Sequence, residues 1–142
     1  MNSEIIITAL NIDKDDDDFT KYRIYLNNGS ASASFEFYNY VDCFNEFGNE
    51  LESFPKSVND TVVFQVGENS EKWAYYMKLK VYCYEPNGNS TIHIELDNHD
   101  SAPNLIKSEF HIKTIPSVLN KFGQELKSWN PKENNQIILK IE

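Results

Sequence analysis

The chain has 142 residues, of which 22 are Asp or Glu and 13 are Lys or Arg, so its formal net charge at pH 7 is −9. This length suits one domain, and an apolar content of 40% indicates a folded chain rather than a disordered one. The acidic balance predicts repulsion from the phosphates of nucleic acid and from anionic membranes, so we expect neither as a partner.

Three strands are predicted before residue 40. The isoleucine-rich segment 4–10 suits a strand, and apolar residues alternate along 21–26 and 30–38. Asn27-Asn28-Gly29 separates the last two, and these residue types tolerate the positive φ of a tight hairpin turn. The order predicts a β-hairpin.

A helix and a fourth strand are predicted next. Asn39 is the expected N-cap, Pro55 ends the helix, and segment 61–66 has the alternation of a strand. Apolar residues at three- and four-residue steps form the predicted helix stripe: Val41, Phe44, Phe47, Leu51 and Phe54.

The second half of the chain repeats this order. Segment 72–84 predicts one long strand or two, Glu85-Pro86-Asn87-Gly88 a turn, and segments 91–96, 109–113 and 136–141 further strands. Between the last two lies a predicted helix with Thr114 as N-cap, Pro116 in its first turn and the stripe Ile115, Leu119, Phe122, Leu126 and Trp129.

An internal repeat underlies this order. Residues 35–67 align without a gap on residues 110–142, and eight of the 33 pairs are identical. We therefore predict an α+β fold in which residues 1–142 form a single domain made of two tandem β-hairpin–helix–strand repeats, about 1–67 and 72–142. Mainly antiparallel sheet should pack against two helices with a pseudo-two-fold relation, in either one continuous sheet or two.

Paired glycines support the repeat. Gly48 and Gly123 occupy the same position in the two predicted helices, where glycine costs about 1 kcal/mol relative to alanine. Their retention predicts a close approach of each helix to a sheet or to the other helix, and chance retention is the alternative.

The densest acidic run is Asp13 to Asp18. It lacks the glycine and glutamate that a calcium-binding EF-hand loop requires at its sixth and twelfth positions, so we interpret it as a solvated loop. Recruitment of a basic partner is the alternative.

No motif indicates catalysis or a cofactor. Asp97-Asn98-His99-Asp100, with His93 nearby, is the one local cluster of histidine and carboxylates, and we interpret it as a polar loop rather than a metal site. Neither Cys43 nor Cys83 has a histidine beside it in the sequence, so no cysteine nucleophile is expected. We predict no catalytic residue, no metal and no cofactor.

Aromatic residues crowd the predicted strand 72–84. Trp73 and four tyrosines lie there, so both faces of the strand carry large side chains. We favour a wholly buried strand over an exposed interface, although Tyr and Trp are also enriched in interfaces.

The second half resembles a known family. Met77 to Tyr82, the turn at Glu85 to Gly88, Ser108-Glu109-Phe110 and the helix Val118 to Trp129 resemble the WapI-type immunity proteins of bacterial polymorphic toxin loci. The resemblance covers roughly residues 77–129. It implies a non-catalytic protein that neutralises a co-encoded toxin by binding it.

An acidic surface would suit a basic toxin domain as the protein partner. The residues predicted to bind it are Asp15, Asp16, Asp17, Asp18, Asp42, Glu46 and Glu50. One alternative is a self-associating structural or accessory protein, a homodimer through its strand aromatics. Another is a small enzyme with dispersed carboxylates.

The expected location is cytoplasmic. No apolar run approaches the roughly 18 residues of a membrane span, and Met1 to Ile7 lacks the basic start of a secretory signal. Two cysteines are too few for a disulfide framework.

Overall fold

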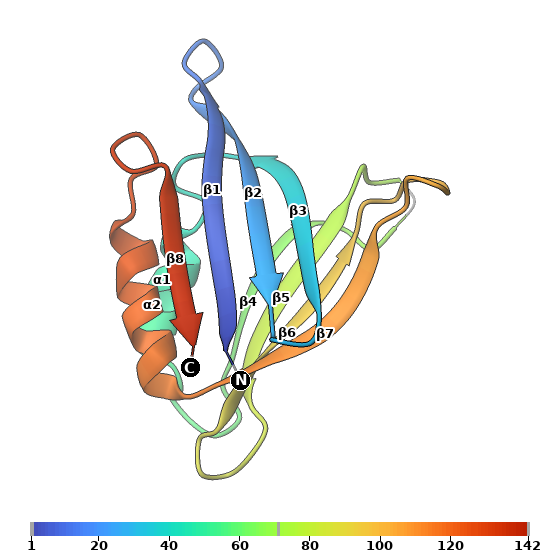
Figure 1. Cartoon of the computed structure of the whole chain (residues 1–142). Helices are drawn as coiled ribbons and strands as arrows, with labels where there is room; N and C mark the ends of the chain where they lie inside the picture. The colour runs from blue at the N-terminus through green and yellow to red at the C-terminus, as the bar shows by residue number, and fades with distance from the viewer. Residues whose placement is uncertain (1, 71, 142) are drawn as a thin grey trace.

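Two four-stranded antiparallel sheets and two helices make up the computed structural model, which describes residues 2–70 and 72–141 (Figure 1). Met1 and Glu142, the outer ends of the two predicted repeats, and Glu71 lie outside the described residues. Sheet A has the strand order β3-β2-β1-β8, with β1 Ser3–Asp13, β2 Phe19–Asn27, β3 Ser32–Asn39 and β8 Gln136–Ile141. Sheet B has the order β4-β5-β6-β7, with β4 Thr61–Gly67, β5 Tyr76–Cys83, β6 Ser90–Asp97 and β7 Lys107–Thr114. The helices are α1 (Asn45–Glu52) and α2 (Pro116–Ser128).

The predicted α+β fold with two β-hairpin–helix–strand repeats is confirmed, and the repeats exchange their last strands. β4, which ends the first repeat, pairs with β5 of the second, with Phe64 opposite Leu79. β8, which ends the second repeat, pairs with β1 of the first, with Ile5 opposite Leu139. The question of one sheet or two is thereby answered: there are two, and each contains strands from both halves.

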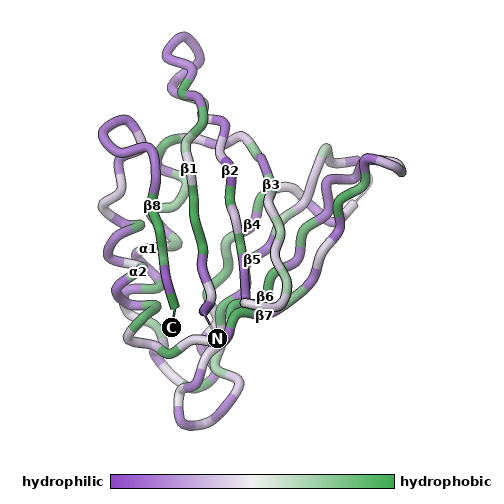
Figure 2. The backbone as a smooth tube through the Cα atoms, viewed as in Figure 1, coloured by the Kyte–Doolittle hydropathy of each residue, from purple (hydrophilic) through white to green (hydrophobic). Residues whose placement is uncertain are grey.

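The hydrophobic core lies between the inner faces of the two sheets and the helices. Alternation along the strands places every second residue inward, and Figure 2 shows the resulting apolar stretches along the strands. An aromatic cluster joins the layers, in which Phe44 stacks on Phe64 with ring centroids 4.6 Å apart. The ring of Phe44 also contacts those of Tyr22, Phe37 and Trp129. Each such ring contributes about 1.5–3 kcal/mol by burial.

The two helices pack directly on each other, as their glycines predict. Asn120 of α2 donates from Nδ2 to the carbonyls of Leu51 (2.9 Å) and Phe54 (2.7 Å), where α1 ends. Lys127 forms an ion pair with Glu52 at 3.1 Å. The two hydrogen bonds from Asn120 satisfy carbonyls that the end of a helix would otherwise leave without a partner.

Three predicted boundaries are wrong. Asn39 is not the N-cap of α1, because it still pairs with Thr20 in sheet A. Turns over residues 40–45 follow, and α1 begins at Asn45 after Phe44. Thr114 likewise ends β7, and Ile115 is the N-cap of α2, while Pro116 lies in the first turn as predicted. The strand predicted over 72–84 is a single strand that begins only at Tyr76.

Within the described part of the chain, neither helix combines the length and the apolar character that crossing a bilayer demands.

Candidate functional site

The outer face of sheet B carries lysine, tyrosine, histidine and glutamate side chains. Strand register arranges them in three cross-strand rows, each with one residue from β4, β5, β6 and β7 in that order. The tyrosine row is Thr61, Tyr82, Thr91 and Lys113; the histidine row is Val63, Lys80, His93 and His111; and the glutamate row is Gln65, Lys78, Glu95 and Glu109.

The tyrosine and histidine rows contain no carboxylate. The Nζ of Lys80 lies 5.7 Å from the ring centroid of Tyr82, a cation–π contact that links the two rows. Val63 is 40% exposed, and His111 and Lys113 are exposed as well, so this part of the face is open to solvent. The two rows therefore offer positive charge beside flat aromatic rings.

The lysines of this face are not neutralised by ion pairs. Among the described residues, no carboxylate lies within 4.0 Å of the ammonium group of Lys78, Lys80, Lys107 or Lys113. Elsewhere in the chain the basic groups are more often paired, as Lys132 is with Asp18 at 2.5 Å. Sheet B thus carries four of the nine lysines that have no ion pair among the described residues.

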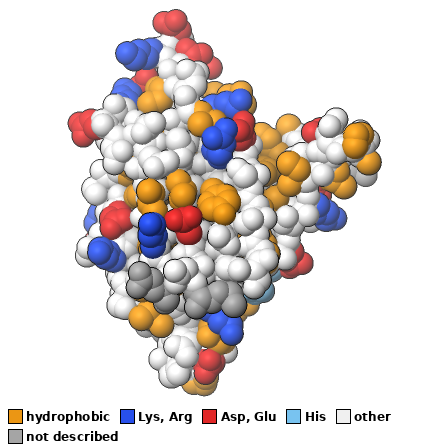
Figure 3. Space-filling model, in the orientation of Figure 1, with side chains coloured by type: hydrophobic (Ala, Val, Ile, Leu, Met, Phe, Trp, Pro, Cys, Tyr) orange, Lys and Arg blue, Asp and Glu red, His pale blue; other side chains and the backbone are white. Residues whose placement is uncertain are grey.

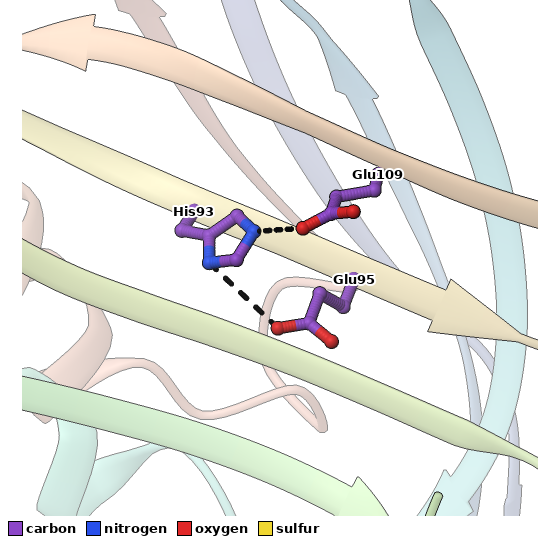
Figure 4. Close-up of side chains that lie close together, drawn as sticks. All are labelled: His93, Glu95 and Glu109. Carbon is purple, nitrogen blue, oxygen red and sulfur yellow. Dashed lines mark hydrogen bonds and ion pairs between the residues drawn. The ribbon is translucent and has the colours of Figure 1, made fainter.

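The glutamate row meets the histidine row in a His–Glu cluster, shown in Figure 4. His93 Nε2 lies 2.6 Å from Glu109 Oε2, and His93 Nδ1 lies 3.7 Å from Glu95 Oε1. The side chain of His93 is 19% exposed, that of Glu95 34% and that of Glu109 66%. The cluster therefore has one half-buried imidazole held between two carboxylates.

His111 supports this cluster from the side. Its ring stacks on that of His93, with centroids 4.5 Å apart and planes at 8°. Its Nδ1 lies 3.2 Å from the hydroxyl of Thr91, which is buried. Partial burial, and then the neighbouring charge of His93, lower the pKa of His111. His111 therefore stays neutral to a lower pH than an ordinary histidine.

An open hollow of about 150 Å³ adjoins the glutamate row. Tyr76, Asp97 and Lys107 line it together with Glu95 and Glu109. This end of the face is mixed in charge, unlike the tyrosine and histidine rows.

The outer face of sheet A differs in charge. Its two adjacent cations, Lys21 and Arg23, both bind Glu36, at 3.3 and 2.9 Å. Ile138, which is 43% exposed, lies opposite Ile6 in the register of β1 and β8. Figure 3 shows this side of the molecule, where apolar and charged side chains lie close together.

The structure does not bring the predicted partner-binding residues together. The acidic run projects as the turn between β1 and β2, at the top of Figure 1, far from α1 behind α2. Asp15, Asp16, Asp17 and Asp18 lie in that turn, Asp42 lies in the turns before α1, and Glu46 and Glu50 lie on α1. They form separate acidic regions.

The residues Asp97 to Asp100 and His93, which the sequence placed near one another, belong to two separate groups in the structure. His99 Nδ1 bonds the carbonyl of Trp73 at 2.7 Å, and its Nε2 lies 3.9 Å from Asp97. His93 belongs instead to the cluster with Glu95 and Glu109. The sequence did not indicate that His93 pairs with Glu109 and stacks on His111, and the strand register of β6 and β7 is the signal that would have found it.

The prediction that the aromatic segment 72–84 is wholly buried is wrong. Tyr76 is 7% exposed, but Tyr82 is half-buried and Tyr84 is 41% exposed.

Cys43 is half-buried against the core, and burial raises the pKa of its thiol to about 12.

Comparison with known proteins identifies a fold likeness. No family model and no curated protein matches the chain. The structure of the plant transcriptional regulator PBF-2 is similar over 93% of this chain and 78% of that one, with a TM-score of 0.52 and 10% identity. The structure of WHY3 from Arabidopsis thaliana matches over 94% and 87%, with a TM-score of 0.45 and 13% identity. The PBF-2 match shows a shared fold.

This finding corrects two predictions. The chain was predicted to be an immunity protein that binds a basic toxin, and nucleic acid was excluded; a fold shared with a transcriptional regulator contradicts both. The exclusion was wrong physically because net charge averages over the whole surface, whereas the lysines of sheet B lie apart from the acidic turn and α1. The resemblance of residues 77–129 to WapI-type proteins stays a prediction.

Proposed function

We propose that this protein binds single-stranded nucleic acid through the outer face of sheet B. The observation that carries the proposal is the set of unpaired lysines beside the half-buried ring of Tyr82 and the exposed ring of His111 in the tyrosine and histidine rows. Lys80 and Lys113 would contact phosphates, and the rings would stack on bases.

The chemistry of the face suits a single strand better than a duplex. Bases of a single strand can turn outward and stack on aromatic rings of a sheet, an interaction that contributes about 1–3 kcal/mol per base. The bases of a duplex are already stacked inside it. A slightly curved sheet whose rings lie in adjacent rows therefore matches splayed bases.

Sheet B is favoured over sheet A by charge. Glu36 occupies both Lys21 and Arg23 on sheet A, whereas Lys80 and Lys113 have no carboxylate partner among the described residues. Sheet A also has an exposed lysine without an ion pair among the described residues, Lys140 of β8, but only sheet B places two such lysines beside the rings of Tyr82 and His111.

The fold likeness supports the same conclusion. The similar structure is that of a plant transcriptional regulator, and proteins of that class act at nucleic acid, directly or through partners. The likeness supports a scaffold suited to this role, and the side chains of sheet B supply the contacts.

We also propose that the chain acts by binding and not as an enzyme. Its His–Glu cluster lies on an open sheet face beside a small hollow. Such a face suits a long ligand that lies across it more than a small substrate that must be enclosed.

A cytoplasmic location is part of this proposal. Cys43 and Cys83 are both free thiols, which reducing compartments favour. Cell fractionation with an antibody against the chain would check it, and recovery outside the cytoplasm would contradict it.

Binding is tested by fluorescence anisotropy with labelled 20-nucleotide single strands of DNA and RNA and with a duplex of the same length, at several salt concentrations. We expect binding to single strands at 50 mM salt, with log affinity falling against log salt at a slope of about −1.4 if Lys80 and Lys113 each contact one phosphate. Preference for the duplex, or no binding at 50 mM salt, would contradict the proposal.

Variants locate the interface. Tyr82→Ala should weaken binding about 5- to 160-fold, the equivalent of one lost stacking contact. The double variant Lys80→Ala/Lys113→Ala should lower the steepness of the salt slope by about 1.4. Lys121→Ala on the exposed side of α2 is the matched control and should change nothing. A loss confined to Lys21, Arg23 or Tyr25 variants would place the interface on sheet A instead.

A further inference from the structure

We propose that His93, Glu95 and Glu109 form a binding site for one divalent transition-metal ion, with Zn²⁺ as the best-suited ion. The inference concerns metal binding by the free protein and does not depend on nucleic acid.

The backbone places these three side chains on one surface. β6 and β7 are antiparallel neighbours, with His93 opposite His111 and Glu95 opposite Glu109. One ligand atom from each of His93, Glu95 and Glu109 lies within 4.8 Å of the others. Ligand atoms around a tetrahedral Zn²⁺ lie about 3.3 Å apart, given bonds of about 2.0–2.2 Å. Glu109 contacts Nε2 and Glu95 contacts Nδ1 of His93, so one ion on a single ring nitrogen would require the two glutamate side chains to rotate toward each other.

The charges of the cluster favour a cation. Two carboxylates that face each other directly across neighbouring strands repel one another. Of the nearest basic groups, only His93 contacts both, and Lys78 in the same row has no ion pair with either. A divalent ion would offset both negative charges at once.

The donor atoms select the class of ion. One imidazole nitrogen with two carboxylate oxygens suits Zn²⁺, Co²⁺, Ni²⁺ or Mn²⁺, whereas Ca²⁺ and Mg²⁺ prefer oxygen ligands alone. Three protein ligands leave a fourth position, which water would fill.

The surroundings fix the imidazole in place. The ring of His93 stacks against that of His111 at 4.5 Å, and His111 is in turn held by the buried hydroxyl of Thr91 at 3.2 Å. The side chain of His93 is only 19% exposed, so its orientation is constrained before an ion arrives. Groups that orient a ligand in this way raise metal affinity.

The experiment titrates the untagged, chelator-treated full chain with ZnCl₂ by calorimetry, and with CoCl₂ while the ring signals of the histidines are followed by NMR. We expect one Zn²⁺ per chain. The ring signals of His93 should broaden first with Co²⁺, while those of His99 stay sharp. The chain has three histidines, so their signals can be assigned with single variants.

Two variants and one control decide the outcome. His93→Ala and Glu109→Gln should each weaken Zn²⁺ binding at least about tenfold. His99→Asn removes the histidine of the other His–carboxylate pair and should leave affinity unchanged. Glu109 is 66% exposed, so Glu109→Gln keeps the test valid even if His93→Ala fails to fold. Unchanged affinity in Glu109→Gln, equal broadening of His99, or no binding of Zn²⁺ by the wild-type chain would overturn the proposal.

Discussion

Gly48 and Gly123 face each other across the contact between α1 and α2, with the backbone of each helix against the missing side chain of the other. A Cβ atom on Gly48 would lie 2.8 Å from the carbonyl oxygen of Gly123, and a Cβ on Gly123 would lie 2.6 Å from that of Gly48. The repeat thus places the same residue on both sides of one contact.

Replacing either glycine by alanine should destabilise the protein although alanine is the better helix former. The added methyl group meets backbone atoms, which cannot rotate away, so we expect a loss of about 1–3 kcal/mol in the free energy of unfolding. Urea denaturation of Gly48→Ala and Gly123→Ala measures it. Gln124→Ala, exposed on α2, is the control and should stay within about 0.5 kcal/mol of wild type. A stabilised Gly123→Ala variant would show that the helices can separate at little cost.

Asn120 should be more important for stability than Asn45, its partner in the repeat. Asn120 donates to two carbonyls at the end of α1, and Asn120→Ala leaves both without that donor. The expected loss is about 1–3 kcal/mol. Asn45 is exposed, so Asn45→Ala should cost much less in the same denaturation experiment. Equal losses in the two variants would contradict the stabilisation of the end of α1 by Asn120.

The thiol of Cys43 should react slowly in the folded protein. Burial raises its pKa to about 12, so at pH 8 its thiolate fraction is about a thousandfold lower than that of an ordinary thiol. The variant Cys83→Ser carries Cys43 alone, and mass spectrometry follows its alkylation by iodoacetamide at pH 8. Labelling should become fast in urea. Fast labelling of the native protein would mean that Cys43 is open to solvent.

Glu36 should stabilise the protein only while it is ionised. The hydrogen bond from Arg23, and further the contact with Lys21, lower the pKa of Glu36. Its contribution is therefore present above the pKa of an unfolded glutamate, about 4.3, and is lost as the pH falls through the lower folded value. The group is exposed, so we expect Glu36→Gln to cost less than about 1 kcal/mol at pH 7 and a smaller amount at pH 3. Melting curves at both pH values test this, with Glu125→Gln as an exposed control. A cost that grows toward acid pH would contradict it.

Local patterns predicted the elements because each pattern has a local physical cause. Alternation along 21–26 and the stripe through Phe47 and Leu51 reflect which side chains face the core, and both appear in the structure. The start of α1 was missed because pairing of Asn39 with Thr20 in the sheet competes with helix capping at that residue.

Long-range relationships were beyond the sequence. The pairing of β8 with β1 joins residues more than 100 positions apart, and no local pattern specifies it. The His–Glu cluster likewise depends on the register between β6 and β7, which brings Glu109 to His93 across 16 positions. Net charge was misleading for a related reason, since it does not record where the lysines lie.

The exchange of β4 and β8 between the two halves has a consequence for how this fold relates to assemblies of shorter chains. A single half in isolation would expose the edge of its three-stranded sheet and leave its last strand without a partner. Two copies of one half could pair the exposed edge of each sheet with the last strand of the other copy, as in a domain-swapped dimer. The 142-residue chain is in this sense a swapped dimer in which the two subunits have been joined end to end. The joining removes the concentration dependence that assembly from separate halves would have.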